Sequence, residues 1–149
     1  MASESKYIEI ESNSASIQTH LAIIQNVIQR MAENSSASKA WCIALVSAIL
    51  VIVADKDKPE LALIALLPIM VFAALDIYYL ALEKAFRNAY NQFISALHKG
   101  TLKEENLYSV EPIGKMSELQ IIAARSFSVW GFYISLAVLV VMAKWVVLG

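Results

Sequence analysis

Residues 61–82 read LALIALLPIMVFAALDIYYLAL, an almost wholly apolar stretch from which the class of fold can be inferred. A helix needs about 20 apolar residues to cross the roughly 30 Å hydrocarbon core of a bilayer, so the stretch can form one span. Pro68 within it predicts a kink. Its one charged residue, Asp76, needs a partner or a route to water, because a carboxylate in hydrocarbon is costly.

Two further apolar runs flank this stretch, at residues 40–54 and 126–143, and from Ser117 the chain can run as helix straight into the last of them. The whole chain of 149 residues is 58% hydrophobic and 17% charged. Globular chains are about 45–50% apolar and about 25% charged. The sequence therefore predicts an all-α membrane protein with three transmembrane helices and cytosolic helical extensions.

The distribution of basic residues predicts the orientation. Regions 1–39 and 83–125 together hold nine Lys and Arg residues, whereas the polar turn DKDKPE at residues 55–60 holds two. Basic loops stay in the cytosol, so both regions are expected there. The organisation follows: a cytosolic arm with an amphipathic helix (1–38), a transmembrane hairpin (39–82), a cytosolic helical connection (83–125) and a third span (126–149).

Lys39 and Asp76 lie equally far along the chain from the middle of the turn, between residues 57 and 58. In a regular helical hairpin they reach the same depth, which predicts an ion pair between the two helices. Two alternatives stay open: Asp76 reaches cytosolic headgroups and water, or it is an ion-gating acid. Glu83 and Arg87, spaced to pair on one helix, complete a proposed joint between the cytosolic and membrane parts.

Small residues recur every fourth position on the first span, at Ser36, Ala40, Ala44 and Ala48. Such strips let membrane helices approach closely. We expect this strip to pack the chain's own three helices, with contact between copies as the alternative.

Five apolar residues of the arm follow a 4, 3, 4, 3 spacing: Ile17, Leu21, Ile24, Ile28 and Met31. Two heptads are too short for a free-standing coiled coil. We expect the helical connection to cover part of this face, and the remainder to serve as an oligomer or partner face.

Two short alternating stretches, KYIEIES at residues 6–12 and LYSVE at residues 107–111, can pair as a two-stranded β element. A lone pair of strands is marginal, so a disordered N-terminus is the alternative.

The sequence offers no chemistry of catalysis. The four glycines are dispersed, the two histidines His20 and His98 lack ligand spacing, and the single cysteine lies inside a span. We therefore expect no enzyme, no cofactor and no metal site. A net charge of −1 disfavours nucleic acid as a partner.

Residues 31–93, with KAWC at 39–42 and YYLALEKAFRNAYNQF at 78–93, resemble a group of small bacterial membrane proteins, some encoded beside antiphage defence genes. The resemblance implies a membrane component of a defence system, of the kind that breaches the inner membrane when a cytosolic sensor is triggered. It carries over no functional residue. The expected location is the bacterial inner membrane, with the N-terminus cytosolic and the C-terminus periplasmic.

Two functions follow as expectations. The first is an oligomeric inner-membrane effector of antiphage defence that permeabilises the membrane in abortive infection. The second is a non-conducting anchor or scaffold that recruits a cytosolic partner protein. The expected partners are the lipid bilayer, further copies of the chain and a cytosolic protein.

Overall fold

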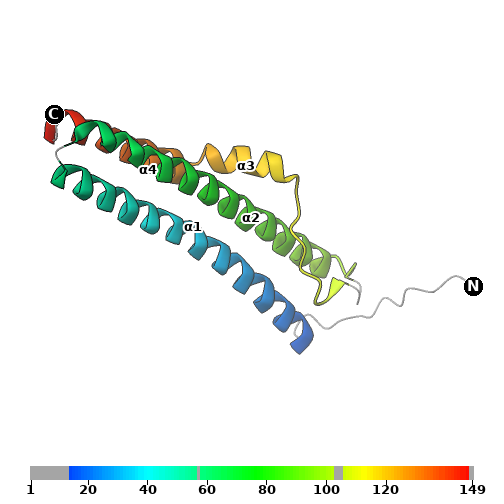
Figure 1. The fold of residues 1–149 in the computed structure, drawn as a ribbon. Coiled ribbons are helices and arrows are strands. Elements are labelled where there is room, and N and C mark those ends of the chain that lie inside the picture. The colour runs from blue at the N-terminus through cyan, green and yellow to red at the C-terminus, as the bar shows by residue number, and fades with distance from the viewer. Residues whose placement is uncertain (1–13, 57, 103–105, 148–149) are drawn as a thin grey trace, which may run out of the picture.

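The computed structural model describes residues 14–56, 58–102 and 106–147, and their regular structure is entirely helical. The elements in chain order are α1 (Ala15–Asp55), the 3₁₀ helix η1 (Pro59–Ala65), α2 (Leu66–His98), α3 (Met116–Ala124), α4 (Phe127–Met142) and the π-helical η3 (Ala143–Val147). The long helices α1 and α2 run antiparallel, α4 packs along the N-terminal part of α2, and α3 lies beside α2 (Figure 1).

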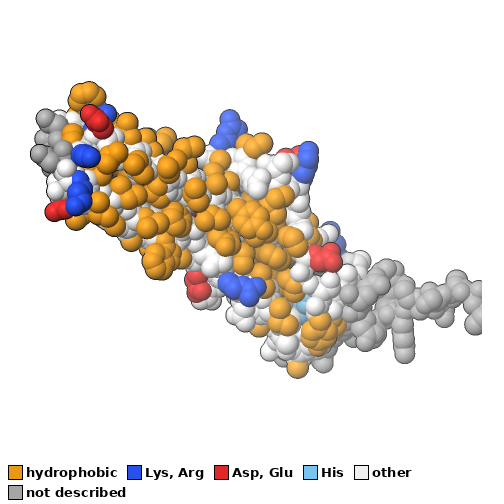
Figure 2. Space-filling view, in the orientation of Figure 1, with side chains coloured by type: hydrophobic (Ala, Val, Ile, Leu, Met, Phe, Trp, Pro, Cys, Tyr) orange, Lys and Arg blue, Asp and Glu red, His pale blue; other side chains and the backbone are white. Residues whose placement is uncertain are grey.

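Three helical segments are long and apolar enough to cross a membrane: Ala15–Asp55, Pro59–His98 and Phe127–Trp145. This confirms the predicted number of candidate spans. We call residues 40–55 of α1, η1, residues 66–75 of α2 and α4 the apolar half. The polar half comprises residues 15–34 of α1, 77–98 of α2 and the described residues of 99–124. Figure 2 shows hydrophobic side chains covering the visible face of the apolar half between charged groups at its two ends.

Local chemistry sets the ends of the long helices. The Ser14 side chain accepts a hydrogen bond from the Ile17 N–H at 3.4 Å and caps α1. Gly100 follows α2 with φ +65°, and Thr101 N–H donates to Ala96 O at 3.0 Å, which closes the helix end. Pro68, where a kink was expected, is the third residue of α2 and directly follows the change from 3₁₀ helix to α-helix at residues 65/66. At this position the backbone N–H needs no partner within α2.

The small-residue strip that packs helices within the chain lies on α2. Ala81, Ala85 and Ala89 recur every fourth residue and are buried. The first two form a core with Leu119 and Ala123 of α3. Their small side chains let α3 lie close against α2, and the Ile113 N–H reaches the Ala85 carbonyl at 3.1 Å.

The strip expected to do this, on α1, faces outward. Ser36, Ala40, Ala44 and Ala48 are all exposed, so the expectation that they pack the chain's own helices is wrong. The inward face of α1 instead carries Ser35, Ser38, Cys42, Val46 and Val53. A helix buries one stripe, and α1 turns this stripe of serine, cysteine and valine inward while its largest side chains, such as Trp41 and Ile52, are exposed.

The five-residue seam of the arm is covered within the chain. Ile17, Ile24 and Met31 are buried, and Leu21 and Ile28 are half-buried. Ile17 packs with Phe93 of α2 and with Leu102. Intrachain cover is therefore confirmed, and the expectation that these five residues present a partner face is corrected, because α2 and the following loop occupy it.

Three further expectations meet the structure differently. Residues 107–111 form no strand, and their proposed partner at 6–12 lies outside the described residues. The chain does not run straight into the last span: α3 ends at Ala124 and α4 begins at Phe127. The division at residues 38/39 and 82/83 coincides with no structural break, because α1 and α2 are continuous there.

Candidate functional site

A buried carboxylate marks the boundary between the two halves. Asp76 is 0% exposed, so the expectation that it simply reaches water is wrong. It follows the buried Ile69 by seven residues, or about two helical turns, and therefore shares the inward face of α2. Burying a charge without a partner is costly, so the neighbours of Asp76 decide what the site is.

Two side chains of α1 satisfy this carboxylate. Ser35 Oγ donates to Asp76 Oδ1 at 2.5 Å, and Lys39 Nζ lies 2.5 Å from Oδ2. Ser35 and Lys39 are four residues apart and so share one face of the helix. The contact between Lys39 and Oδ2 is an ion pair and lacks the geometry of a hydrogen bond. The predicted pair between the first two spans is present.

The third span also reaches this site. Tyr133 of α4 is buried, and its hydroxyl donates to the Phe72 carbonyl of α2 at 3.1 Å. Phe72 precedes Asp76 by one helical turn, so the Tyr133 hydroxyl lies about one turn from the carboxylate along α2. The carboxylate thus lies where all three long apolar helices meet, and its ion pair joins α1 to α2.

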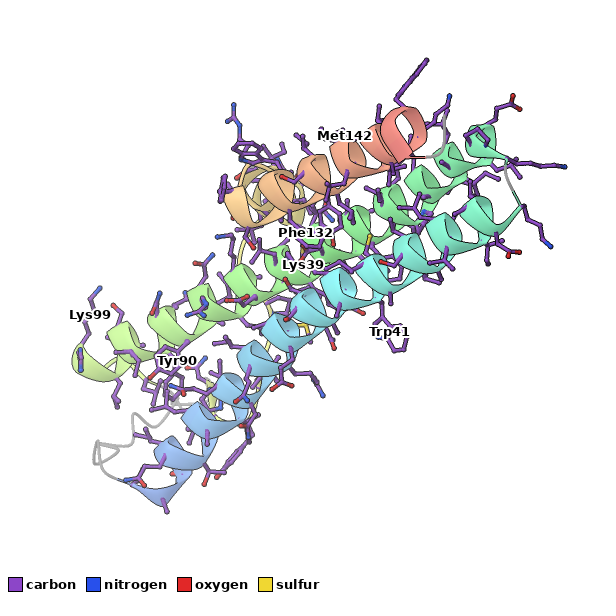
Figure 3. All side chains as sticks on the ribbon, turned by 90° about the vertical axis from the view of Figure 1, so that its left-hand side faces the viewer. Lys39, Trp41, Tyr90, Lys99, Phe132 and Met142 are labelled. Carbon is purple, nitrogen blue, oxygen red and sulfur yellow. The ribbon has the colours of Figure 1, made fainter. Side chains whose placement is uncertain are left out.

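Exposed aromatic residues surround the site at the same level of the bundle. Trp41 is 65% exposed and follows Lys39 by two residues. Tyr78 and Trp130 are also exposed, and they lie close in sequence to Asp76 and Tyr133. Figure 3 shows Trp41 pointing away from the bundle, while Lys39 lies between the helices. Such aromatic residues favour the level where a membrane meets water.

The remaining two residues of the predicted joint form a separate pair. Arg87 Nε donates to Glu83 Oε1 at 2.8 Å on the surface of α2. Glu83 follows Asp76 by seven residues, which places it about 10 Å farther along the helix. The structure therefore pairs all four residues but does not bring them into one site.

Two members of the site were missed from the sequence. Ser35 had a usable signal, because it precedes Lys39 by one helical turn and faces the same way. Tyr133 had no such signal in the sequence. Its span is apolar on every side, so the sequence does not reveal which side faces the other helices.

A second buried polar group lies in the polar half. His20 is 1% exposed, its ring lies 4.3 Å from that of Phe93, and its Nδ1 accepts the Tyr108 N–H at 2.9 Å. Burial lowers the pKa of His20 below its usual 6.5. Tyr108 adopts a left-handed φ of 64°. A cavity of about 410 Å³ beside His20 is bounded by α1, α2 and the loop that follows α2.

Among the residues that the structure describes, no three His, Cys, Asp or Glu side chains are grouped so that they could hold a metal ion. The comparisons with known proteins give no relative: no family model matches the chain, and neither does any curated protein or solved structure.

Proposed function

We propose that this protein is an effector of the bacterial inner membrane that assembles with copies of itself and permeabilises the membrane when its cytosolic part is displaced. The observation that carries the proposal is the continuity of α1 and α2. Each runs unbroken from the polar half into the apolar half, and the Lys39–Asp76 pair joins them at the crossing.

Because α1 and α2 are each continuous, a movement of one end can be passed along the helix to the other. An unbroken helix moves nearly as a rigid body, so a displacement of its polar end tilts or shifts its apolar end. The buried ion pair opposes separate movement of α1 and α2, because parting them strands a charge in the bundle. The polar half, which we assign to the cytosol from its basic residues, receives the signal.

Assembly uses the outward face of α1. Ala40, Ala44 and Ala48 are exposed there, and small residues on a lipid-facing helix favour close contact with another helix. In line with the resemblance to membrane proteins of antiphage defence, the signal comes from a cytosolic sensor protein.

The test uses liposomes loaded with a fluorescent dye and carrying the purified protein. Asp76→Asn removes the charge that holds the junction, and we expect dye release several-fold faster than with the wild type. Asp55→Asn is the matched control, because its carboxylate pairs with Lys56 at the exposed far end of α1. Dye retained equally by both variants and the wild type contradicts the proposed leak.

A second measurement does not depend on a variant. Cells expressing the wild-type chain together with its defence system are followed with a potential-sensitive dye after infection. We expect the membrane potential to collapse before the cells stop growing. Growth arrest with an intact potential contradicts the leak.

One observation favours a second function, a non-conducting anchor that recruits a cytosolic partner. No Asp, Glu, Lys, Arg or His residue occurs between Lys39 and Asp55 or between Glu60 and Asp76. Apart from the Cys42 thiol, the spans therefore offer only hydroxyl groups to line a path for ions. Stable co-purification of a cytosolic protein, with no conductance in planar bilayers, decides for the anchor.

A further inference from the structure

The outer surface of the apolar half contains a groove between α1 and α4, which we call the α1–α4 groove. Its volume is about 660 Å³, within the roughly 300–1,000 Å³ of ordinary ligand sites. Small residues line it at Ser47, Ser128, Gly131 and Ser135, between larger ones such as Leu50 and Leu139. The groove exists because α4 packs mainly on α2 and η1 and touches α1 little.

The lining suits hydrocarbon although it contains serines. Ser135 Oγ donates to the Gly131 carbonyl at 2.7 Å. A hydroxyl bonded to its own helix is satisfied in lipid without an outside partner. Most of the remaining lining is aliphatic or aromatic.

The length of the groove suits an acyl chain. Along α4 the lining extends from Phe127 to Val140, or about 20 Å of helix. This length exceeds the roughly 15 Å that the hydrocarbon of one leaflet spans, so an acyl chain can lie along the groove for its whole depth in the leaflet.

The charge at one end selects the headgroup. Phe127 and Ser128 line this end, and the exposed Arg125 lies two residues before Phe127. Arg125 has no ion-pair partner among the described residues. Lys39, one turn before Ile43 of the lining, is already paired with Asp76. Near the other end, the Lys144 ammonium is held over the Trp145 ring, 5.3 Å from its centroid.

We propose that the α1–α4 groove binds one anionic phospholipid, with an acyl chain along α4 and the phosphate beside Arg125. The proposal depends on the three helices lying in a bilayer, but not on the leak. A protein that never conducts can still hold this lipid, so the two proposals fail separately.

The test is native mass spectrometry of the full chain released from vesicles of equal parts phosphatidylglycerol and phosphatidylcholine. We expect one retained lipid, with phosphatidylglycerol favoured about fivefold, the effect of one cation near an anionic surface. Arg125→Gln removes the preference, and Arg30→Gln, an exposed cation distant in sequence from the lining, keeps it. Ser135→Leu fills the groove and abolishes retention, whereas Ser36→Leu, an equal change outside the lining, does not.

A measurement on the wild type guards against a variant that fails to fold. Phosphatidylglycerol with a photoreactive group in its acyl chain is incorporated into the vesicles and activated by light. We expect the label on residues 128–139 and 43–50, and little on the outward residues Val51 and Met70 of other faces.

Three results overturn the proposal. The first is equal retention of the two lipids by the wild type, which indicates ordinary surrounding lipid. The second is a label spread evenly over all outward faces. The third is a disulfide between copies of a Ser135→Cys variant in the bilayer, which makes a second copy the occupant.

Discussion

The polar and apolar halves are built from the same two helices, but their cores hold different residues. Between α1 and α2, the polar half buries large side chains such as Ile24 and Phe93, and the outer face of α1 is mostly polar. The apolar half buries small ones such as Cys42 and Ala65, and exposes large ones such as Val51 and Met70. The apolar half therefore leaves many of its large apolar side chains exposed, although Ile69 and Tyr133 are buried there.

This difference is what we expect of a bundle whose apolar half lies in lipid and whose polar half lies in water. In water, burying large apolar side chains drives two helices together. In lipid there is no such gain, and close packing with a few polar contacts must hold the helices instead. We expect the two halves to respond differently to the same kind of substitution.

The largest difference is expected at the junction. Lys39→Ala leaves Asp76 buried and unpaired, and we expect it to destabilise the bundle by about 3–5 kcal/mol. Helical circular dichroism during denaturant titration in detergent micelles measures the loss. Lys56→Ala, which breaks an exposed pair, should change little. Replacing both partners, as Lys39→Met with Asp76→Leu, should recover most of the stability, and a double variant as unstable as the single one contradicts the pair's role.

A matched pair of isoleucines compares the halves directly. Ile24 is 2% exposed in the polar half and Ile69 is 5% exposed in the apolar half. Ile24→Ala should cost about 2–5 kcal/mol, as in a water-soluble core. Ile69→Ala should cost about half as much. It removes packing contacts, but a side chain surrounded by lipid gains no hydrophobic free energy from burial that the substitution could take away. The same titration measures both, and equal losses would mean that lipid does not surround the apolar half.

The smallest effect concerns pH and should appear in the polar half alone. The folded pKa of His20 is lowered by burial, so folding favours the neutral ring. The stabilisation is complete above the unfolded pKa of 6.5 and is lost as the pH falls through the folded value. Hydrogen exchange at the Tyr108 amide, corrected for its intrinsic rate, should become faster as the pH is lowered from about 8 to about 5.

His20→Asn provides the control for this pH effect. Its amide oxygen can accept the Tyr108 N–H but does not titrate, so exchange should lose its pH dependence. A pH response that persists in His20→Asn would contradict the role of His20.

The sequence was sufficient to predict the three apolar helices and the Lys39–Asp76 pair. Long apolar runs are unambiguous because a bilayer sets their length. The pair followed from counting outward from the turn, which works because both helices are regular. The stop at Gly100 was also predictable, because glycine tolerates its positive φ.

The sequence did not reveal which face of a span turns inward. In a uniformly apolar helix both faces look alike, so the α1 strip of Ala40, Ala44 and Ala48 was assigned to the wrong contact. The buried strip on α2 begins at Ala81, where polar residues surround it and helical periodicity becomes informative. His20 was missed because its burial depends on a loop folding back from residue 108.

The unbroken length of α1 sets the distance between its N-terminal tip and the Lys39–Asp76 pair. From Ala15 to Lys39 the helix rises about 36 Å. With Lys39 at the level of the lipid headgroups, the Ala15 end would lie well above them. Inserting seven residues into both α1 and α2 above the junction would raise that tip by about 10 Å with little rotation. A partner protein that a rigid complex holds at a fixed distance from the membrane would then no longer be level with the tip of α1.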